Sequence, residues 1–398
     1  MRVLMLNERD LTHPLAGGAE VHLEEIASRL HAAHGIETTV LCAGYPGGAP
    51  EEMRRGIRYC RFGNRFTYYP QVPLRARREV AGGDYALVVE NLCKLLYFSQ
   101  LYLPRIPKLG LVHHLFGMSA FQQVMPPVAA FVVASEALLP ILYRRWPFVV
   151  VSPSTRDDLV RRGIPAANVR VIPNGIDGLK FCPGAPAVEA DLVVFVGRVE
   201  HYKGVDLLLD AWLPLRARCP RARLVIVGEG SALPEMRRRS SAAAFAGSVS
   251  FTGFVPESSK IEWLRRATVV VQPSRKEGWG LTVVEANACG TPVVANDVPG
   301  LRDSVRHGET GLIAARGSES AFAAALASIL SDPELRARLA LGARRWAARF
   351  TWEAAAEAMA TVIVAAARRK PLPAVPELLG PALDAASEAT PARRAIYP

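Results

Sequence analysis

The stretch PSRKEGWGLTVVEANACGTPVVAND, residues 273–297, predicts a nucleotide-binding turn between a buried strand and a helix. Gly278 and Gly280 keep the loop that holds Glu277 from becoming helical, and the apolar run after them begins a helix near Leu281. The first turn of such a helix presents unpaired backbone N–H groups and a partial positive charge. It is therefore a candidate site for a diphosphate.

Two carboxylates, Glu277 and Glu285, lie on either side of this predicted helix start. Glu285 falls one helical turn inside, about 5 Å along the axis, where it could accept hydrogen bonds from a ribose diol. Glu277 would then face the group that the phosphate carries. Two glutamates at this spacing are usually ordinary surface charges. The apolar strand before them, the glycines between them and the small-residue helix after them together favour a nucleotide site.

Length and charge restrict the class of protein. A chain of 398 residues favours two domains, because one core rarely supports that length. Lys and Arg number 48 against 37 Asp and Glu, and the net charge of +11 favours anionic ligands or an anionic membrane surface. The 6 cysteines are scattered without a C-x-x-C pair, and no histidines cluster at metal-ligand spacing. We predict reduced thiols and no metal site, and we expect no nucleic-acid partner.

Neither the N-terminus nor the longest apolar stretch resembles a membrane or export signal. The first strand is short and is followed by the charged residue Glu8, without a long hydrophobic region or a cleavage site. Residues 124–143 are apolar but contain three prolines and Glu136, so we predict a buried strand or helix there and no membrane span. The expected location is cytoplasmic, with a peripheral position at the inner membrane as the alternative.

Short apolar runs alternate with helical patterns along the chain, as in parallel sheets flanked by helices. The predicted strands of the first half are VLML, TTVLC, IRYCR, YALVVE, LGLVH, FVVVS and VRVIP. A second series, DLVVFVGR, ARLVIVGEG, VSFTGFV, ATVVVQPS and TPVVAND, begins at Asp191. The restart predicts two doubly wound domains joined near the Pro- and Gly-rich stretch 175–186. Ligands would bind between the carboxyl ends of their strands.

Two segments fit this scheme badly. Residues 54–78 are rich in arginine and aromatic residues and lack regular periodicity over most of their length. We expect a solvated loop there, and the alternative is a loop that binds the acceptor or a membrane surface. The tail after Lys370 is rich in proline and alanine, and we expect a packed or disordered extension without a catalytic part.

Further candidate ligand-binding residues follow other predicted strands. Arg198 and Lys203 flank a strand-to-helix turn and could neutralise a diphosphate without a metal, since Arg grips phosphate bidentately and Lys adds a point charge. Gly18, after Gly17, opens a helix and would let the backbone approach a phosphate closely. His113 and His114 end a strand and point to opposite faces, so that one can be structural while the other lines the cleft.

Taken in order, these motifs resemble the family 4 retaining glycosyltransferases of the GT-B fold, from Met1 to about Arg369. The motifs that carry the resemblance are GGAE at Gly17, HHLFG at His113, PNGID at Pro173, VGR…KG at Arg198 and Lys203, FTGFV at Phe254, and E-x7-E from Glu277 to Glu285. The resemblance implies two doubly wound Rossmann-like α/β domains that face a central cleft. The implied divisions are an acceptor-side domain over 1–175, a nucleotide-sugar-binding domain over 176–350, a helix crossing back over 351–370, and a tail over 371–398.

The resemblance also implies a role for each matching residue. Arg198 and Lys203 would hold the donor diphosphate, Glu285 the ribose and Glu277 the transferred sugar. His114 would be the active-site histidine, with His113 as the alternative. The other implied donor-binding positions are Gly17, Gly18, Phe254, Val255, Gly278, Trp279, Gly280, Leu281 and Thr282. Two departures, Trp279 in place of Phe or Tyr and Pro153 in place of an acidic residue, put the fit of the acceptor or sugar in question.

The implied activity is metal-independent, retaining transfer of a sugar from a UDP- or GDP-sugar to a hydroxyl group. The acceptor could be a glycan, a lipid-linked sugar or a small natural product. No cofactor is expected beyond the nucleotide-sugar co-substrate. The alternatives are a GT-B nucleotide-sugar epimerase and an inert subunit of a glycan assembly complex. A dehydrogenase is disfavoured because Leu233 stands at the third glycine position of the apparent fingerprint in LVIVGEGSAL.

Overall fold

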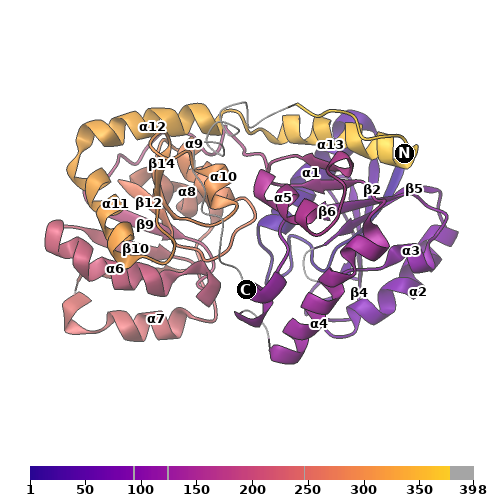
Figure 1. The fold of residues 1–398 in the computed structure, drawn as a ribbon, viewed down its shortest axis with the longest axis horizontal. Helices are drawn as coiled ribbons and strands as arrows, with labels where there is room; N and C mark the ends of the chain where they lie inside the picture. Colours follow the sequence, from indigo (N-terminus) through magenta and orange to yellow (C-terminus); the bar gives the residue numbers. More distant parts are fainter. Residues whose placement is uncertain (93–94, 123–124, 246, 377–398) are drawn as a thin grey trace.

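The computed structural model describes residues 1–376 except 93–94, 123–124 and 246. Two α/β units lie side by side, one in each half of the chain (Figure 1). The first sheet has strand order β3-β4-β2-β1-β5-β6-β7-β8, and the second has the order β11-β10-β9-β12-β13-β14. All pairs are parallel except β3 with β4. The predicted α/β class with two Rossmann-like domains is confirmed.

Apolar runs form the central strands because both faces of a parallel sheet are covered by helices. The first sheet consists of β1 (Arg2–Leu6), β2 (Glu37–Ala43), β3 (Glu51–Arg54), β4 (Ile57–Phe62), β5 (Tyr85–Asn91), β6 (Lys108–Val112), β7 (Phe148–Val150) and β8 (Val169–Val171). Its helices are α1 (Gly18–His34), α2 (Tyr68–Ala81), α3 (Ser99–Tyr102), α4 (Pro126–Ala137) and α5 (Pro153–Arg161), with short helices η1 (Gly117–Gln122), η2 (Leu139–Tyr143) and η3 (Ala166–Asn168).

The second half repeats the alternation of strand and helix. Its strands are β9 (Leu192–Val196), β10 (Arg223–Val227), β11 (Val249–Gly253), β12 (Val269–Gln272), β13 (Val293–Asn296) and β14 (Gly311–Ala314). Its helices are α6 (Val205–Arg218), α7 (Leu233–Ser240), α8 (Glu257–Arg266), α9 (Leu281–Ala288), α10 (Leu301–Ser304), α11 (Glu319–Ser331) and α12 (Pro333–Ala347), with η4 (His201–Lys203) and η5 (Ala243–Phe245). The edge strands β3 and β14 were not predicted, and in β3 three of the four residues are charged.

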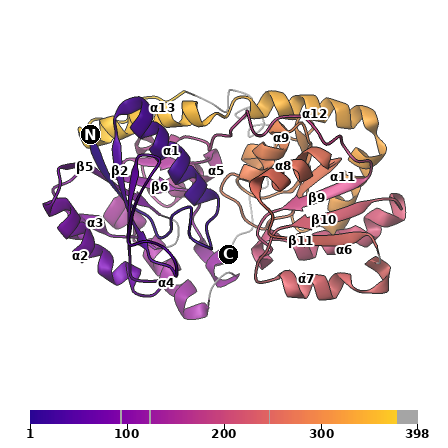
Figure 2. The ribbon, with the colours of Figure 1, turned by 180° about the vertical axis from the view of Figure 1, so that it is seen from behind.

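The last helix, α13 (Trp352–Ala367), returns to the first half and lies along α1 (Figures 1 and 2). Trp352 and Met359 pack in the same core as Leu23 of α1. The two segments that join the halves also lie together, since a Cβ atom at Gly175 would stand 2.3 Å from the backbone nitrogen of Trp352. The predicted domain boundaries after residues 175 and 350 remain predictions.

The prediction of a solvated loop over residues 54–78 is wrong. The segment contains β4 and the first part of α2. The buried residues of α2 are Tyr68, Val72 and Ala76, which are spaced by four and so form one apolar stripe along the helix. Arginines between them hid this stripe in the sequence.

We predicted a buried strand or helix over residues 124–143. The prediction of a helix is correct, and the prediction that it is buried is wrong. Residues Pro126–Tyr143 form α4 and η2, and only 33% of this stretch is buried. By length and composition it could cross a membrane, with a mean hydropathy of 1.6. Glu136 instead attaches this helical stretch to the rest of the first half, because its buried carboxylate pairs with Arg162 of the segment after α5 at 3.0 Å.

The tail prediction can be checked only as far as residue 376, and residues 377–398 lie outside the described part of the chain. Leu372 packs against the core of the first half, and the Arg170 guanidinium donates a hydrogen bond to the Pro373 carbonyl at 2.6 Å. The beginning of the tail is therefore packed.

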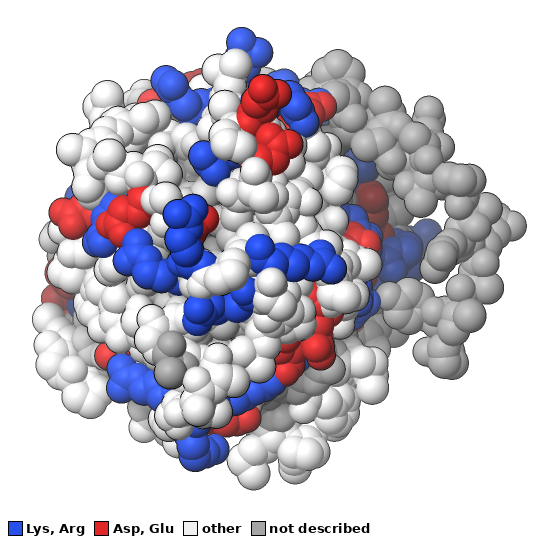
Figure 3. Space-filling view, turned by 90° about the vertical axis from the view of Figure 1, so that its left-hand side faces the viewer, with Lys and Arg blue, Asp and Glu red and all other residues white. Residues whose placement is uncertain are grey.

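Basic and acidic side chains are mixed on the surface. At the end of the molecule formed by the second half, acidic side chains lie beside many of the basic ones (Figure 3). Because basic and acidic side chains are mixed in this way, the net positive charge does not by itself locate an anion site. The position of such a site depends on which cations lack an acidic partner.

Candidate functional site

The predicted nucleotide-binding turn forms between β12 and α9. Gly280 precedes the first residue of α9 and has φ 88°, a left-handed conformation that favours glycine. A Cβ atom at Gly278 would lie 2.1 Å from the His113 carbonyl oxygen of the first half. The two glycines therefore let the loop turn sharply and lie directly against the opposite domain.

The N-terminus of α1 lies next to that of α9. A Cβ atom at Gly18 would stand 3.0 Å from Cδ1 of Leu281, the first residue of α9. The N–H of Gly17 donates to the Glu20 carboxylate at 2.7 Å, so this amide already has an acceptor. Two helix starts with partial positive charge thus meet where the halves face each other, which favours an anionic ligand between them.

Lys203 and Glu277, predicted to bind different parts of the donor, form an ion pair. Lys203 Nζ lies 2.5 Å from Glu277 Oε1, and the Ser274 hydroxyl donates to the same oxygen at 2.9 Å. Burial disfavours the charge on Lys203, but Glu277 and Tyr202 outweigh it and raise the pKa of the ammonium group. Lys203 is therefore a fully charged cation held in place by Glu277.

Tyr202 connects the two predicted phosphate-binding cations. The Arg198 guanidinium donates to the Tyr202 hydroxyl at 2.7 Å, and Lys203 Nζ lies 5.3 Å from the centre of the ring. Arg198 is exposed, so it can turn toward a ligand. Tyr202 was not predicted to be a site residue, although the sequence places this aromatic residue between Arg198 and Lys203, where it can contact both cations.

Glu285 lies inside α9, as predicted, and has a partner that was not predicted. Lys260 of α8 donates to Glu285 Oε1 at 2.8 Å. Phe254 and Val255 follow the end of β11, at the same carboxyl edge of the sheet that precedes Arg198 and Glu277. Phe254 is 76% exposed, whereas Val255 packs against the domain core.

The structure separates the two adjacent histidines. His113 is buried, with its ring 5.0 Å from that of His22. His114 is only partly buried, and burial together with the nearby cations Lys276 and Lys203 lowers its pKa to about 4, against the opposing effect of Glu277. His114 is therefore the histidine on the side of the Lys203–Glu277 pair, and it is neutral near pH 7.

Other side chains around the site were not predicted, because they form hydrogen bonds between the two halves of the chain. Lys276 Nζ donates to the Phe116 carbonyl at 2.7 Å and to the Ser119 hydroxyl at 3.1 Å. The Ser154 N–H donates to the Asp303 carboxylate at 2.9 Å. The bonds of Lys276 fix the loop that precedes α9 against the first domain, and the bond to Asp303 joins α10 to α5. No local pattern predicts pairs so far apart in sequence.

Trp279 does not shape the site with its side chain. It is 2% exposed, and its ring packs edge-on against Phe350 with centroids 5.1 Å apart. Only its backbone can face a ligand. The substitution of Trp for the usual Phe or Tyr therefore alters the core of the second domain rather than the surface that would contact sugar or acceptor.

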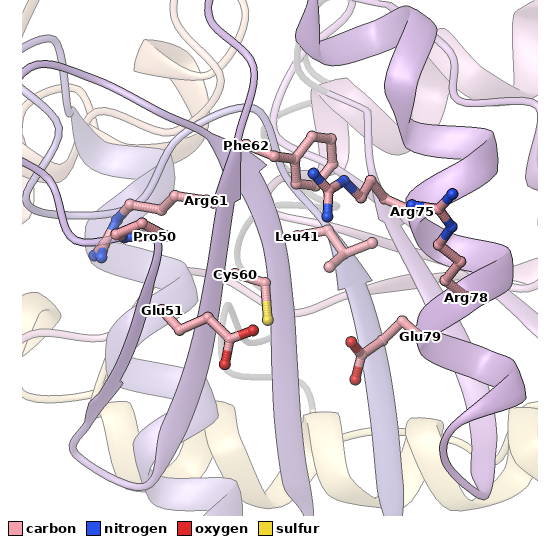
Figure 4. Close-up of a pocket in the computed structure, with 9 residues that line it drawn as sticks. All are labelled: Leu41, Pro50, Glu51, Cys60, Arg61, Phe62, Arg75, Arg78 and Glu79. Carbon is pink, nitrogen blue, oxygen red and sulfur yellow. The ribbon is translucent and has the colours of Figure 1, made fainter.

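Four of the eight arginines in the basic segment 54–78 pair with acidic residues. Arg54 and Arg55 pair with Glu24 and Glu25 of α1. Further pairs join Arg58 with Glu79, and Arg61 with Asp10 and Glu52. Figure 4 shows a cavity of about 270 Å³ beside this segment, where Glu51 and Glu79 lie on either side of Cys60 and Arg75 lies beside Phe62. Charges of both signs line it, so it does not resemble an anion site.

Among the residues that the structure describes, no group of three or more His, Cys, Asp or Glu side chains could hold a metal ion. The cations described above, Arg198 and Lys203, and the start of α9 are the positive groups at the carboxyl edge of the second sheet that could face a diphosphate.

Comparison with known proteins assigns the family. Residues 16–178 match the model for Glycosyltransferase Family 4, and residues 184–346 match the model for Glycosyl transferases group 1. D-inositol 3-phosphate glycosyltransferase from Jonesia denitrificans is 37% identical over 214 residues, covering 49% of this chain and 50% of that protein. Glycogen synthase from Mycobacterium tuberculosis is 34% identical over 234 residues, covering 57% and 56%. The chain spans about half the length of these curated relatives.

Solved structures show the same fold over nearly the whole chain. Sucrose-phosphate synthase from Thermosynechococcus elongatus superposes with a TM-score of 0.75 at 24% identity, covering 90% of this chain and 97% of that one. Anabaena HepE in complex with UDP and glucose has a TM-score of 0.75 at 21% identity, covering 92% and 100%. The two family models and the shared fold place the chain among the GT-B glycosyltransferases, with a first half of the family 4 type and a second half of group 1.

Proposed function

We propose that the protein transfers a sugar from a nucleoside diphosphate sugar to an acceptor hydroxyl, with retention of anomeric configuration and without a metal. The observation that carries this proposal is the arrangement of Lys203 and Arg198 around Tyr202, at the carboxyl edge of the second sheet where α9 begins. These groups supply positive charge for a departing diphosphate. The names of the curated relatives support glycosyl transfer.

Each proposed role follows from position. The backbone N–H groups of Gly280, Leu281 and Thr282 at the start of α9 would bind the diphosphate, together with Lys203 and Arg198. Glu285, one turn further along the helix, would accept hydrogen bonds from the ribose of UDP or GDP. The remaining proposed contacts are Gly18 with the diphosphate and Phe254 and Val255 with the base.

In the proposed reaction, the bond from the anomeric carbon to the diphosphate oxygen breaks, and the acceptor oxygen bonds to that carbon on the same face. The acceptor proton passes to the departing phosphate. His114 would donate a hydrogen bond to the transferred sugar, since its low pKa keeps the ring neutral, with one N–H and one acceptor nitrogen. Glu277 would bind sugar hydroxyls while it holds Lys203.

The test is release of nucleoside diphosphate from a panel of UDP- and GDP-sugars, with and without candidate hydroxyl acceptors. We expect acceptor-dependent release with at least one donor. An epimerase would convert a nucleotide sugar without an acceptor. No release or conversion, with UDP or GDP still bound, would indicate an inert binding partner.

We further propose that the acceptor is reached at an anionic membrane surface, through an exposed face of α4 and η2. This α4 face consists of Met125, Val128, Phe131, Leu138 and Ile141, which are 38–73% exposed. Its spacing follows the turns of the helix.

Charge around the α4 face supports a lipid partner. Glu136 is the only charged residue within 126–143, and it lies on the buried side. Arg144 and Arg145 are exposed directly after η2, where they could meet anionic headgroups. The α4 face is therefore a better candidate for membrane contact than segment 54–78, in which four of the eight arginines pair with carboxylates. Lys276 links η1, which precedes α4, to the proposed donor loop.

Vesicle sedimentation can separate these two surfaces. We expect the protein to bind phosphatidylglycerol vesicles at low salt, and the double variant Phe131→Ser/Ile141→Ser to lose this binding. Phe66→Ser is the matched control, since Phe66 is a 72% exposed aromatic residue of segment 54–78. Loss of vesicle binding in Phe66→Ser alone would show that segment 54–78, and not the α4 face, contacts the membrane. No binding by the unaltered protein would favour a soluble acceptor.

A further inference from the structure

A cavity of about 380 Å³ lies between α12 and the turn that precedes β14. One stripe of α12, formed by Arg338, Leu341 and Arg345, lines one side together with Arg349 from the turn after the helix, and Arg306 lies on the other. The intervals of three and four residues place the helix positions on one face. We call this space the α12 cavity.

The walls of the α12 cavity are held by close packing. A Cβ atom at Gly342 would stand 2.0 Å from the Glu309 carbonyl oxygen, so the turn rests directly on the helix backbone. The Trp346 ring is 2% exposed, and its N–H donates to the Ser304 carbonyl at 2.8 Å. The base of the cavity, formed by the helix backbone at Gly342 and the ring of Trp346, is thus part of the folded structure.

Unpaired positive charge gathers at the α12 cavity. Of its charged lining residues, Glu309 already pairs with Arg306 at 2.9 Å. Within the described part of the chain, Arg338, Arg345 and Arg349 have no carboxylate partner. Elsewhere on the second half, acidic side chains lie beside many of the basic ones (Figure 3). Mutual repulsion of these guanidinium groups would be relieved by a bound anion.

Trp346 adds an aromatic surface to these charges. The guanidinium carbons of Arg306 and Arg349 lie 5.2 and 5.6 Å from the centre of its ring. Contact with the ring orients planar guanidinium groups, and an oriented guanidinium can donate two parallel hydrogen bonds to a phosphate. Leu341, 50% exposed, provides an apolar edge.

We propose that the α12 cavity binds a small ligand that carries a phosphate group. Phosphate is the anion that arginine recognises best through paired hydrogen bonds. The volume is that of a small-molecule site rather than a groove for a polymer. The cavity shares no residue with the proposed donor site, so the inference does not rest on the proposed function.

Binding of inorganic pyrophosphate, measured by calorimetry at constant ionic strength, tests this site. We expect saturable binding of pyrophosphate that weakens at least about tenfold in Arg345→Gln/Arg349→Gln. The matched control is Arg336→Gln/Arg344→Gln, which removes the same charge from the same helix outside the cavity, and in which affinity should be unchanged.

Equal pyrophosphate affinity in the two double variants would overturn the proposal, as would the absence of saturable binding in the unaltered protein. The same titration in Lys203→Ala protein separates this proposal from the donor-site proposal. If Lys203→Ala protein binds UDP as tightly as the unaltered protein while pyrophosphate still distinguishes the two double variants, the donor site is wrong and the α12 cavity stands.

Discussion

Arginine serves different purposes in residues 54–61 and at the proposed donor site. In the first half, Arg54, Arg55, Arg58 and Arg61 each pair with a carboxylate. In the second half, Arg198 bonds to a tyrosine hydroxyl instead. The number of basic residues in a segment therefore does not locate an anion site. What matters is whether the fold supplies acidic partners, and these come from α1 and other elements distant in sequence.

The largest expected effect is on stability, from Arg61→Ala. Arg61 and Asp10 form a pair in which both side chains are 1% exposed. Removing one partner leaves the other charge buried, so we expect the free energy of unfolding to fall by about 3–5 kcal/mol. Urea denaturation measures the change. The control Arg65→Ala removes an exposed arginine from the same segment and should cost less than about 0.5 kcal/mol. A similar small loss in both would show that pairing in the first half is not structural.

The next effect is on catalysis, from Lys203→Ala and Arg198→Ala. Each removes a cation proposed to stabilise the leaving diphosphate, so we expect kcat/KM to fall at least about a hundredfold, equivalent to about 2.7 kcal/mol. Lys180→Ala is a suitable control because Lys180 is exposed and pairs with Glu257. Circular dichroism should show that all three variants are folded. Turnover near that of the unaltered protein in either site variant would remove the phosphate-binding role from that residue.

A smaller effect is expected from the buried histidines behind the site. Burial lowers the pKa of His22 to about 4, despite its hydrogen bond to Asn174, and burial also holds the pKa of His113 well below its usual value. Below pH 6.5 the unfolded chain takes up protons that the folded protein does not. Stability should therefore decrease as the pH falls from 6.5 toward 4, by up to about 1.4 kcal/mol per pH unit for each histidine.

Urea denaturation between pH 7 and pH 5 measures this slope. The variant His22→Gln should show a shallower dependence on pH, because one of the three histidines with a lowered pKa is gone. Identical slopes in the variant and the unaltered protein would mean that His22 is protonated in the folded state.

The sequence was sufficient for the features encoded by local patterns. Apolar runs predicted the central strands, and the glycines around Glu277 predicted the turn before α9, because both depend on neighbouring residues. Helix α2 was missed because its stripe of Tyr68, Val72 and Ala76 is interrupted by arginines. The partners of Glu285 and Lys276 were missed for another reason: Lys260 and Phe116 approach them only through the fold. The roles of the site residues stay predictions.

The central claim is that positive groups of the protein itself neutralise the leaving diphosphate. Its most direct test is the rate of sugar transfer in excess EDTA, compared with the rate after addition of Mg²⁺ or Mn²⁺. If Lys203, Arg198 and the start of α9 supply the charge, the rate should be unchanged in EDTA and should not rise when metal is added. A loss of transfer in EDTA that Mg²⁺ or Mn²⁺ restores would contradict this account.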